Sequence, residues 1–212
     1  MKQSHKTGLF PFFCYIMVFC LNLGWLWMKD RWSLSMQMAI PVLSFLLGGL
    51  GVWWRTQGDA NIETTSYVRK ALWVFTLYYM AILSVLLFFG GLFHLDRGWG
   101  GSVNLVPFHT IHNYIRFYRN TGSMVSVFNL VGNIVITIPL GMLLPLLWKR
   151  LRHWFLAIPI LAFFCVGVEY LQWLTATGTA DIDDSILNFV GGCVGYGLTR
   201  LGQMIWNWRK RR

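Results

Sequence analysis

Six stretches of this sequence are apolar over about 19 residues or more, and this segmentation limits the folds that the chain can adopt. A helix rises about 1.5 Å per residue, so each stretch can cross the roughly 30 Å hydrocarbon core of a bilayer. Backbone polar groups must be satisfied internally in lipid, so the sequence predicts an all-α membrane protein, a polytopic bundle of about six transmembrane helices. The stretches are residues 9–28, 36–54, 71–93, 125–148, 154–174 and 185–206.

The composition supports an integral membrane protein. Of the 212 residues, 56% are hydrophobic and only 12% are charged, and no polar stretch is long enough to build a separate soluble core. The net charge of +10 could suggest nucleic acid, but the basic residues gather at the ends of the apolar stretches, where a membrane explains them better. We therefore expect no nucleic-acid partner. The predicted divisions are a three-helix segment (1–93), an outer loop with the last three helices (94–206) and a basic tail (207–212).

The distribution of Lys and Arg predicts the orientation. If the amino terminus is cytoplasmic, 13 of the 18 basic residues lie on the cytoplasmic side and 5 on the outer side. Both termini are therefore predicted to be cytoplasmic. In this orientation the unusual polar residues of the last three helices meet at the extracytoplasmic leaflet.

The longest loop, residues 94–124, is predicted to contain a helix lying in the outer interface. Phe108, Ile111, Ile115 and Tyr118 recur at helical spacing, which favours an apolar face turned toward lipid. The opposite stripe is a solvated, snorkelling face or a contact for lipid headgroups or phosphate. Its residues are His109, His112, Arg116 and Arg119.

Glu169 is the only acidic residue well inside a predicted span, and Gln172 lies three positions later on the same helix side. An unpaired carboxylate at membrane depth is costly. Glu169 must therefore find hydrogen-bond donors, meet water or hold a proton. Two interpretations stay open: a structural link between helices, or contact with a ligand or a proton in transit.

Three aspartates, Asp181, Asp183 and Asp184, precede the last stretch, and Asn188 follows one turn later. Capping of a helix amino terminus explains one or two of them. The others could bind a divalent cation, although no EF-hand pattern is present, or perform acid/base chemistry together with Glu169. His109 and His112, with His94 and Asp96, could form a zinc site, but histidines at an interface are more common. We expect no metal and no cofactor.

The fourth and sixth stretches resemble each other locally and should run in the same direction. Residues 126–133 and 185–192 both match S-x-x-N-[LF]-V-G-[NG]. Gly191 and Gly195 have the GxxxG spacing that lets two helix backbones approach closely. This pattern predicts that the two helices pack against shared neighbours.

An ordered set of short motifs between residues 104 and 197 resembles the VanZ-like family of bacterial membrane proteins. Many relatives carry an arginine before the aspartates, whereas this chain has Thr-Gly-Thr-Ala at 177–180, so a fixed cation beside the acids is not expected. The motifs are Asn104-Leu-Val-Pro107-Phe108, Asn129-x-x-x-Asn133, Pro139-x-Gly141, Glu169-x-x-Gln172 and Asp181-Ile-Asp183-Asp184-x-x-x-Asn188-x-x-Gly191-x-x-x-Gly195.

The resemblance implies a multi-pass plasma-membrane protein, often of Gram-positive bacteria, whose name-giving relatives lower susceptibility to teicoplanin and related lipoglycopeptides. It implies no catalytic mechanism. Our leading hypothesis is binding or screening of a membrane lipid, a lipid-linked ligand or the antibiotic at the outer leaflet. Its candidate ligand-binding residues are Asn104, Asn129, Asn133, Glu169, Gln172, Asp181, Asp184 and Asn188.

Two alternatives to the leading hypothesis stay open. The first is a membrane-embedded enzyme acting on a lipid-linked cell-wall precursor, with Glu169 and Asp184 as candidate catalytic residues. The second is a small transporter, for which polar residues near the middle of the membrane would be expected.

Overall fold

The structure, a computed structural model, describes residues 62–84 and 103–211. The chain divides into two compact units, residues 1–78 and 79–212, and each is considered by itself. The predicted spans 9–28 and 36–54 lie outside the described residues. The described elements are α3 (Ile62–Ser84), β1 (Val103–Asn104), α4 (His109–Thr121), α5 (Met124–Leu147), η3 (Lys149–Arg152), α6 (Trp154–Leu174), β2 (Ala180–Asp181) and α7 (Ile182–Lys210).

The helix bounds agree closely with the apolar stretches in the second half of the chain. The predicted stretch 154–174 coincides with α6, and α5 begins and ends one residue before the predicted 125–148. Helix α7 extends beyond 185–206 at both ends, and α3 begins nine residues before the predicted residue 71. Apolarity detects the part of a helix that can lie in lipid, so polar turns that continue the helix are missed. The predicted end of the third span, residue 93, lies outside the described residues.

Two of the described helices, α5 and α6, are apolar enough and long enough to cross a membrane. The described part of the chain is mostly helical, which agrees with the predicted fold class. The count of six spans, the cytoplasmic termini and the division into segments stay predictions.

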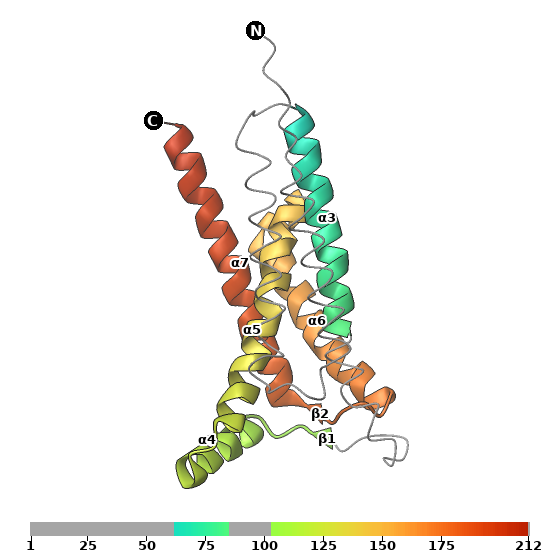
Figure 1. The fold of residues 1–212 in the computed structure, drawn as a ribbon, viewed down its shortest axis with the longest axis vertical. Coiled ribbons are helices and arrows are strands. Elements are labelled where there is room, and N and C mark those ends of the chain that lie inside the picture. Colours follow the sequence, from blue (N-terminus) through green and yellow to red (C-terminus); the bar gives the residue numbers. More distant parts are fainter. Residues whose placement is uncertain (1–61, 85–102, 212) are drawn as a thin grey trace, which may run out of the picture. The chain divides into compact units, whose positions relative to one another are not determined.

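Helices α5 and α7 pack side by side and run in the same direction, as their local resemblance predicts (Figure 1). Contacts advance together along both helices: Asn133 bonds Asp184, Thr137 bonds the carbonyl of Asn188, and Gln203 bonds the carbonyl of Pro145. The backbones approach closely at Gly191 and Gly195, where an added Cβ would collide with the carbonyl oxygens of Ile134 and Ile138. The GxxxG spacing therefore serves helix packing here.

The apolar core of this unit lies where α6 meets the α5 and α7 pair. Leu144, Ala157, Leu161 and Tyr196 form its buried cluster. The Tyr196 hydroxyl donates to the carbonyl of Arg152 at 2.8 Å, so the ring fills the core while its polar end is satisfied. These contacts hold the three helices together at a distance from the polar end of the unit.

Helix α4 and the two short strands lie at the amino-terminal end of α7. The strands pair in parallel, with Val103 opposite Ala180 and Asn104 opposite Asp181. Helix α4 is present in the predicted loop, and none of its residues is buried. Exposed Phe108, Ile115 and Tyr118 fit the predicted apolar face, whose placement in a membrane interface stays a prediction.

Candidate functional site

Asp183 caps a helix that lies far from it in the sequence. Its carboxylate accepts backbone N–H groups of Phe108, Thr110 and Ile111, the last two at 2.7 and 3.1 Å. These are donors that the first turn of α4 leaves without partners, and α4 has no cap from its own side chains. Asp183 is 0% exposed, and its negative charge lies at the positive end of the α4 dipole. Its role is structural.

Asp181 is also used by the fold. Its Oδ1 accepts the backbone N–H of Asp183 at 2.9 Å, which caps α7 in the way that the sequence predicts for one of the acids. Its Oδ2 accepts the hydroxyl of Thr110 at 2.5 Å and the side-chain amide of Asn104 at 3.3 Å. Asp181 therefore joins α7, β1 and α4.

Glu169 and Asp184 keep acceptor capacity that the described part of the chain does not use. Among the described residues, Glu169 receives one hydrogen bond, from the backbone N–H of Asp181 at 3.2 Å, and Asp184 receives one, from the side-chain amide of Asn133. Glu169 is 7% exposed, and Asp184 is half-buried. The charge of Asp184 acts on Glu169, so the two carboxylates belong to one electrostatic cluster.

Asn188 adds an unsatisfied acceptor one turn along α7 from Asp184. Its side chain is 4% exposed, and its Oδ1 is buried with no hydrogen-bond partner in the described part of the chain. A buried amide oxygen without a donor costs about 1–3 kcal/mol. Asn188 lines a small cavity together with Thr137, Cys165 and Val168, so its side chain lies apart from the hydrogen bonds of the acids.

Tyr114 and Asn129 connect α4 to α5 beside the acids. Burial raises the pKa of the Tyr114 phenol, the charges of Asp184 and Asp181 raise it further, and a hydrogen bond with Asn129 opposes these effects. The Tyr114 hydroxyl therefore stays protonated at neutral pH and can donate.

The structure brings most of the predicted ligand-binding residues together, but not all of them. Asn104, Asn133, Glu169, Asp181 and Asp184 belong to one hydrogen-bonded and charged cluster at the amino-terminal end of α7. Gln172 packs beside Gly178 in the link after α6. The residues of the predicted headgroup stripe, His109, His112, Arg116 and Arg119, are all exposed on α4, and the ring of His109 contacts Asn113 at 3.3 Å.

The arrangement of the acids bears on the cation alternative. In residues 62–84 and 103–211 no group of three or more His, Cys, Asp or Glu side chains is placed to hold a metal ion. Asp181 and Asp183 point their oxygens at protein N–H and O–H groups, which is the arrangement of structural carboxylates rather than of metal ligands. His94 and Asp96 lie outside the described residues.

Sequence reasoning missed Thr110 and Tyr114. Thr110 donates both its hydroxyl and its backbone N–H to the aspartates, and Tyr114 lies under their charges. The two residues are four positions apart, so they share one face of α4. Two hydroxyl-bearing residues at this spacing are the signal that could have found them.

Comparisons with known proteins find similarity to one family over the part of the chain that carries this cluster. A family model described as VanZ/LLP1 matches residues 71–205. Protein VanZ of Enterococcus faecium is 31% identical over 112 residues, which are 51% of this chain and 59% of that protein. The chain therefore spans less than two thirds of the length of this relative. No solved structure matches the chain.

Proposed function

The chain belongs to the VanZ/LLP1 family, and from this premise we propose that it lowers susceptibility to lipoglycopeptide antibiotics of the teicoplanin type. In this proposal the protein is a multi-pass protein of the plasma membrane and acts at the outer leaflet. It binds or screens a lipid-linked ligand with Glu169, Asp184 and Asn133 of the cluster at the amino-terminal end of α7. The spare acceptors of this cluster are the observation that carries the proposal.

The cluster favours a ligand that donates hydrogen bonds. The two carboxylates, Glu169 and Asp184, each have acceptor capacity left, while Thr110 donates to Asp181 and Asp183 and not to them. An ammonium group or amide N–H groups next to a lipid chain would satisfy them. The exposed apolar side chains of α4 offer a neighbouring surface for that chain.

The test is expression of the chain in a susceptible host. The minimal inhibitory concentration should rise more for a lipidated glycopeptide than for a non-lipidated one. The reason is that the proposed site binds a hydrogen-bond donor attached to a lipid chain, and only the lipidated drug carries both groups. Equal shifts for both drugs, or no shift, would overturn the proposal.

The Asp184→Asn variant is expected to lose most of this resistance while keeping its abundance in the membrane. Replacing the charged acceptor weakens a hydrogen bond worth about 1.5–3 kcal/mol, so affinity should fall roughly 10- to 100-fold. Resistance and membrane abundance are measured together, with Asp184→Glu as the variant that keeps the charge. Full resistance in Asp184→Asn would exclude a role of this carboxylate in binding.

A membrane-embedded enzyme is the second candidate, favoured by the observation that Glu169 and Asp184 share one cluster and that each accepts a single hydrogen bond among the described residues. One carboxylate would take a proton from an attacking water, and the other, protonated, would give one to the leaving oxygen of a lipid-linked cell-wall precursor. Mass spectrometry of precursors from expressing cells should then show a hydrolysed species that is absent with Glu169→Gln. An unchanged precursor profile, or full conversion by Glu169→Gln, would reject this candidate.

A further inference from the structure

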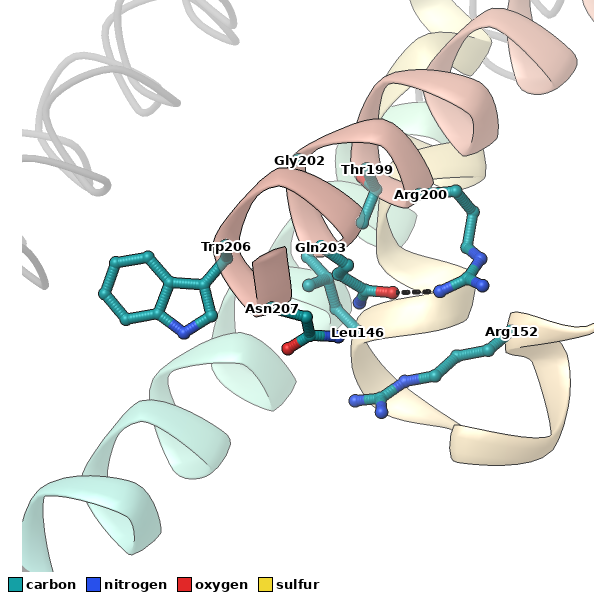
Figure 2. A pocket seen from close by; sticks show the side chains of 8 residues that line it. All are labelled: Leu146, Arg152, Thr199, Arg200, Gly202, Gln203, Trp206 and Asn207. Carbon is teal, nitrogen blue, oxygen red and sulfur yellow. Dashed lines mark hydrogen bonds between the residues drawn. The ribbon is translucent and has the colours of Figure 1, made fainter. Parts of the chain in front are cut away.

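Figure 2 shows a cleft of about 410 Å³ between the end of α5, the η3 turn and the carboxyl-terminal part of α7. This volume is within the range of small-molecule sites. It is lined by Leu146, Arg152, Thr199, Arg200, Gly202, Gln203, Trp206 and Asn207.

The cleft lies about one bilayer thickness from the acidic cluster. Its residues on α7, 199–207, follow Asp184 by 15 to 23 positions, which along a helix is about 22–35 Å. The hydrocarbon core of a bilayer is about 30 Å thick. If the acids meet one interface, the cleft therefore meets the other.

Two guanidinium groups face this cleft without an anionic partner in residues 103–211. Arg200 donates to the side-chain oxygen of Gln203 at 2.6 Å, and Arg152 donates from Nε to the carbonyl of Pro145 at 3.3 Å. In residues 103–211 every carboxylate belongs to the distant cluster: Glu169, Asp181, Asp183 and Asp184. The cleft therefore presents two positive charges and no negative one from this part of the chain.

A hydrogen-bond network holds both arginines in place before any ligand arrives. Gln203 accepts from Arg200 and donates to the same Pro145 carbonyl that receives Arg152, at 3.3 Å. Pro145 lies inside α5, and its neighbour Gln203 comes from α7, so the network bridges the two helices. Holding charged side chains in one arrangement lowers the entropy lost on binding.

We propose that this cleft binds the phosphate of an anionic glycerophospholipid. Planar guanidinium groups match phosphate oxygens in charge and geometry. Leu146 and Trp206, both exposed, would contact the glycerol and the first acyl carbons, in the way that Trp favours membrane interfaces. The bound lipid would link the carboxyl-terminal parts of α5 and α7. This site contains none of the acidic residues.

The experiment is native mass spectrometry of the purified full chain with phosphatidylglycerol or phosphatidylcholine of identical acyl chains. Phosphatidylglycerol should form a one-to-one adduct at about tenfold lower concentration than phosphatidylcholine. The double variant Arg152→Gln with Arg200→Gln should lose this preference. Arg209→Gln with Arg211→Gln removes the same charge from exposed residues near the same end, and this control should keep the preference within about twofold.

A second pair of variants tests the site without touching either arginine. Gly202 lines the cleft and Gly197 does not, and an added Cβ meets nothing within 4 Å at either position. Gly202→Phe should fill the cleft and weaken the phosphatidylglycerol adduct about tenfold, while Gly197→Phe should leave it unchanged.

Four results would overturn the proposal. Equal adducts with both lipids would mean that the cleft does not distinguish an anionic headgroup from a zwitterionic one. Equal losses in the two arginine pairs would mean that surface charge alone attracts the lipid. Equal losses in the two glycine variants would mean a general effect on the helix. Displacement of phosphatidylglycerol by inorganic phosphate, with no preference for the lipid, would assign the cleft to a soluble anion.

Discussion

Replacing Asp183 with alanine is expected to detach α4 from the helical unit and to lower the free energy of unfolding by about 3–5 kcal/mol. The variant removes a fully buried carboxylate that accepts three backbone N–H groups from the first turn of α4. It also frees Phe108, whose φ of 64° is held by one of these bonds and costs about 1–2 kcal/mol. Denaturant unfolding of the purified chain measures the loss, and hydrogen exchange of residues 108–111 measures the detachment.

Two variants make the Asp183 result specific. Asp183→Asn keeps the volume and one acceptor oxygen, so its stability should lie between the native chain and Asp183→Ala. Asp184→Asn removes the adjacent charge but weakens only the bond from Asn133, so it should cost about 1 kcal/mol. Slow exchange at 108–111 in Asp183→Ala would show that other contacts hold α4.

Replacing Gly191 with alanine should separate α5 from α7 and cost about 2–3 kcal/mol. The new Cβ would collide with the carbonyl oxygen of Ile134 and approach the hydroxyl of Thr137. A backbone carbonyl cannot move aside as a flexible side chain can, so the two helices must shift. The shift would also disturb the bonds of Thr137 to Asn188 and of Asn133 to Asp184, so resistance should fall together with stability. Thermal unfolding in detergent and the inhibitory concentration are the two measurements.

Gly197→Ala is the matched control, on the same helix. An added Cβ meets nothing within 4 Å there, and alanine is the better helix former by about 0.5–1 kcal/mol. The two variants should therefore change stability in opposite directions. A native melting temperature in Gly191→Ala would mean that α5 and α7 do not pack as closely as the structure has them.

The helices could be predicted from the sequence because apolar length is a local property. The stretch 154–174 matches α6, and α5 is off by one residue at each end. The polar turns of α3 and α7 were missed for the same reason, since they lie outside the apolar part of the helix. The packing of α5 on α7 could also be predicted from the sequence, because the glycines that allow it recur at a fixed spacing.

The site was only partly predictable. Sequence reasoning assigned one or two aspartates to capping, and Asp181 does cap α7, but it had no means to find that Asp183 caps α4. The donors in that contact are backbone N–H groups, which every residue carries, so no side-chain pattern marks them. Thr110 was missed for a similar reason. Its hydroxyl reaches Asp181 only because the pairing of β1 with β2 brings the start of α4 to the start of α7.

The cap on α4 also sets an order of assembly. Phe108 and Asp183 are 75 positions apart, so a ribosome that adds about 5–20 residues per second makes α4 roughly 4–15 s before its cap. During that interval the first amides of α4 lack the carboxylate that accepts them. Only when α7 has been made can the chain close this end, so the acidic cluster forms last.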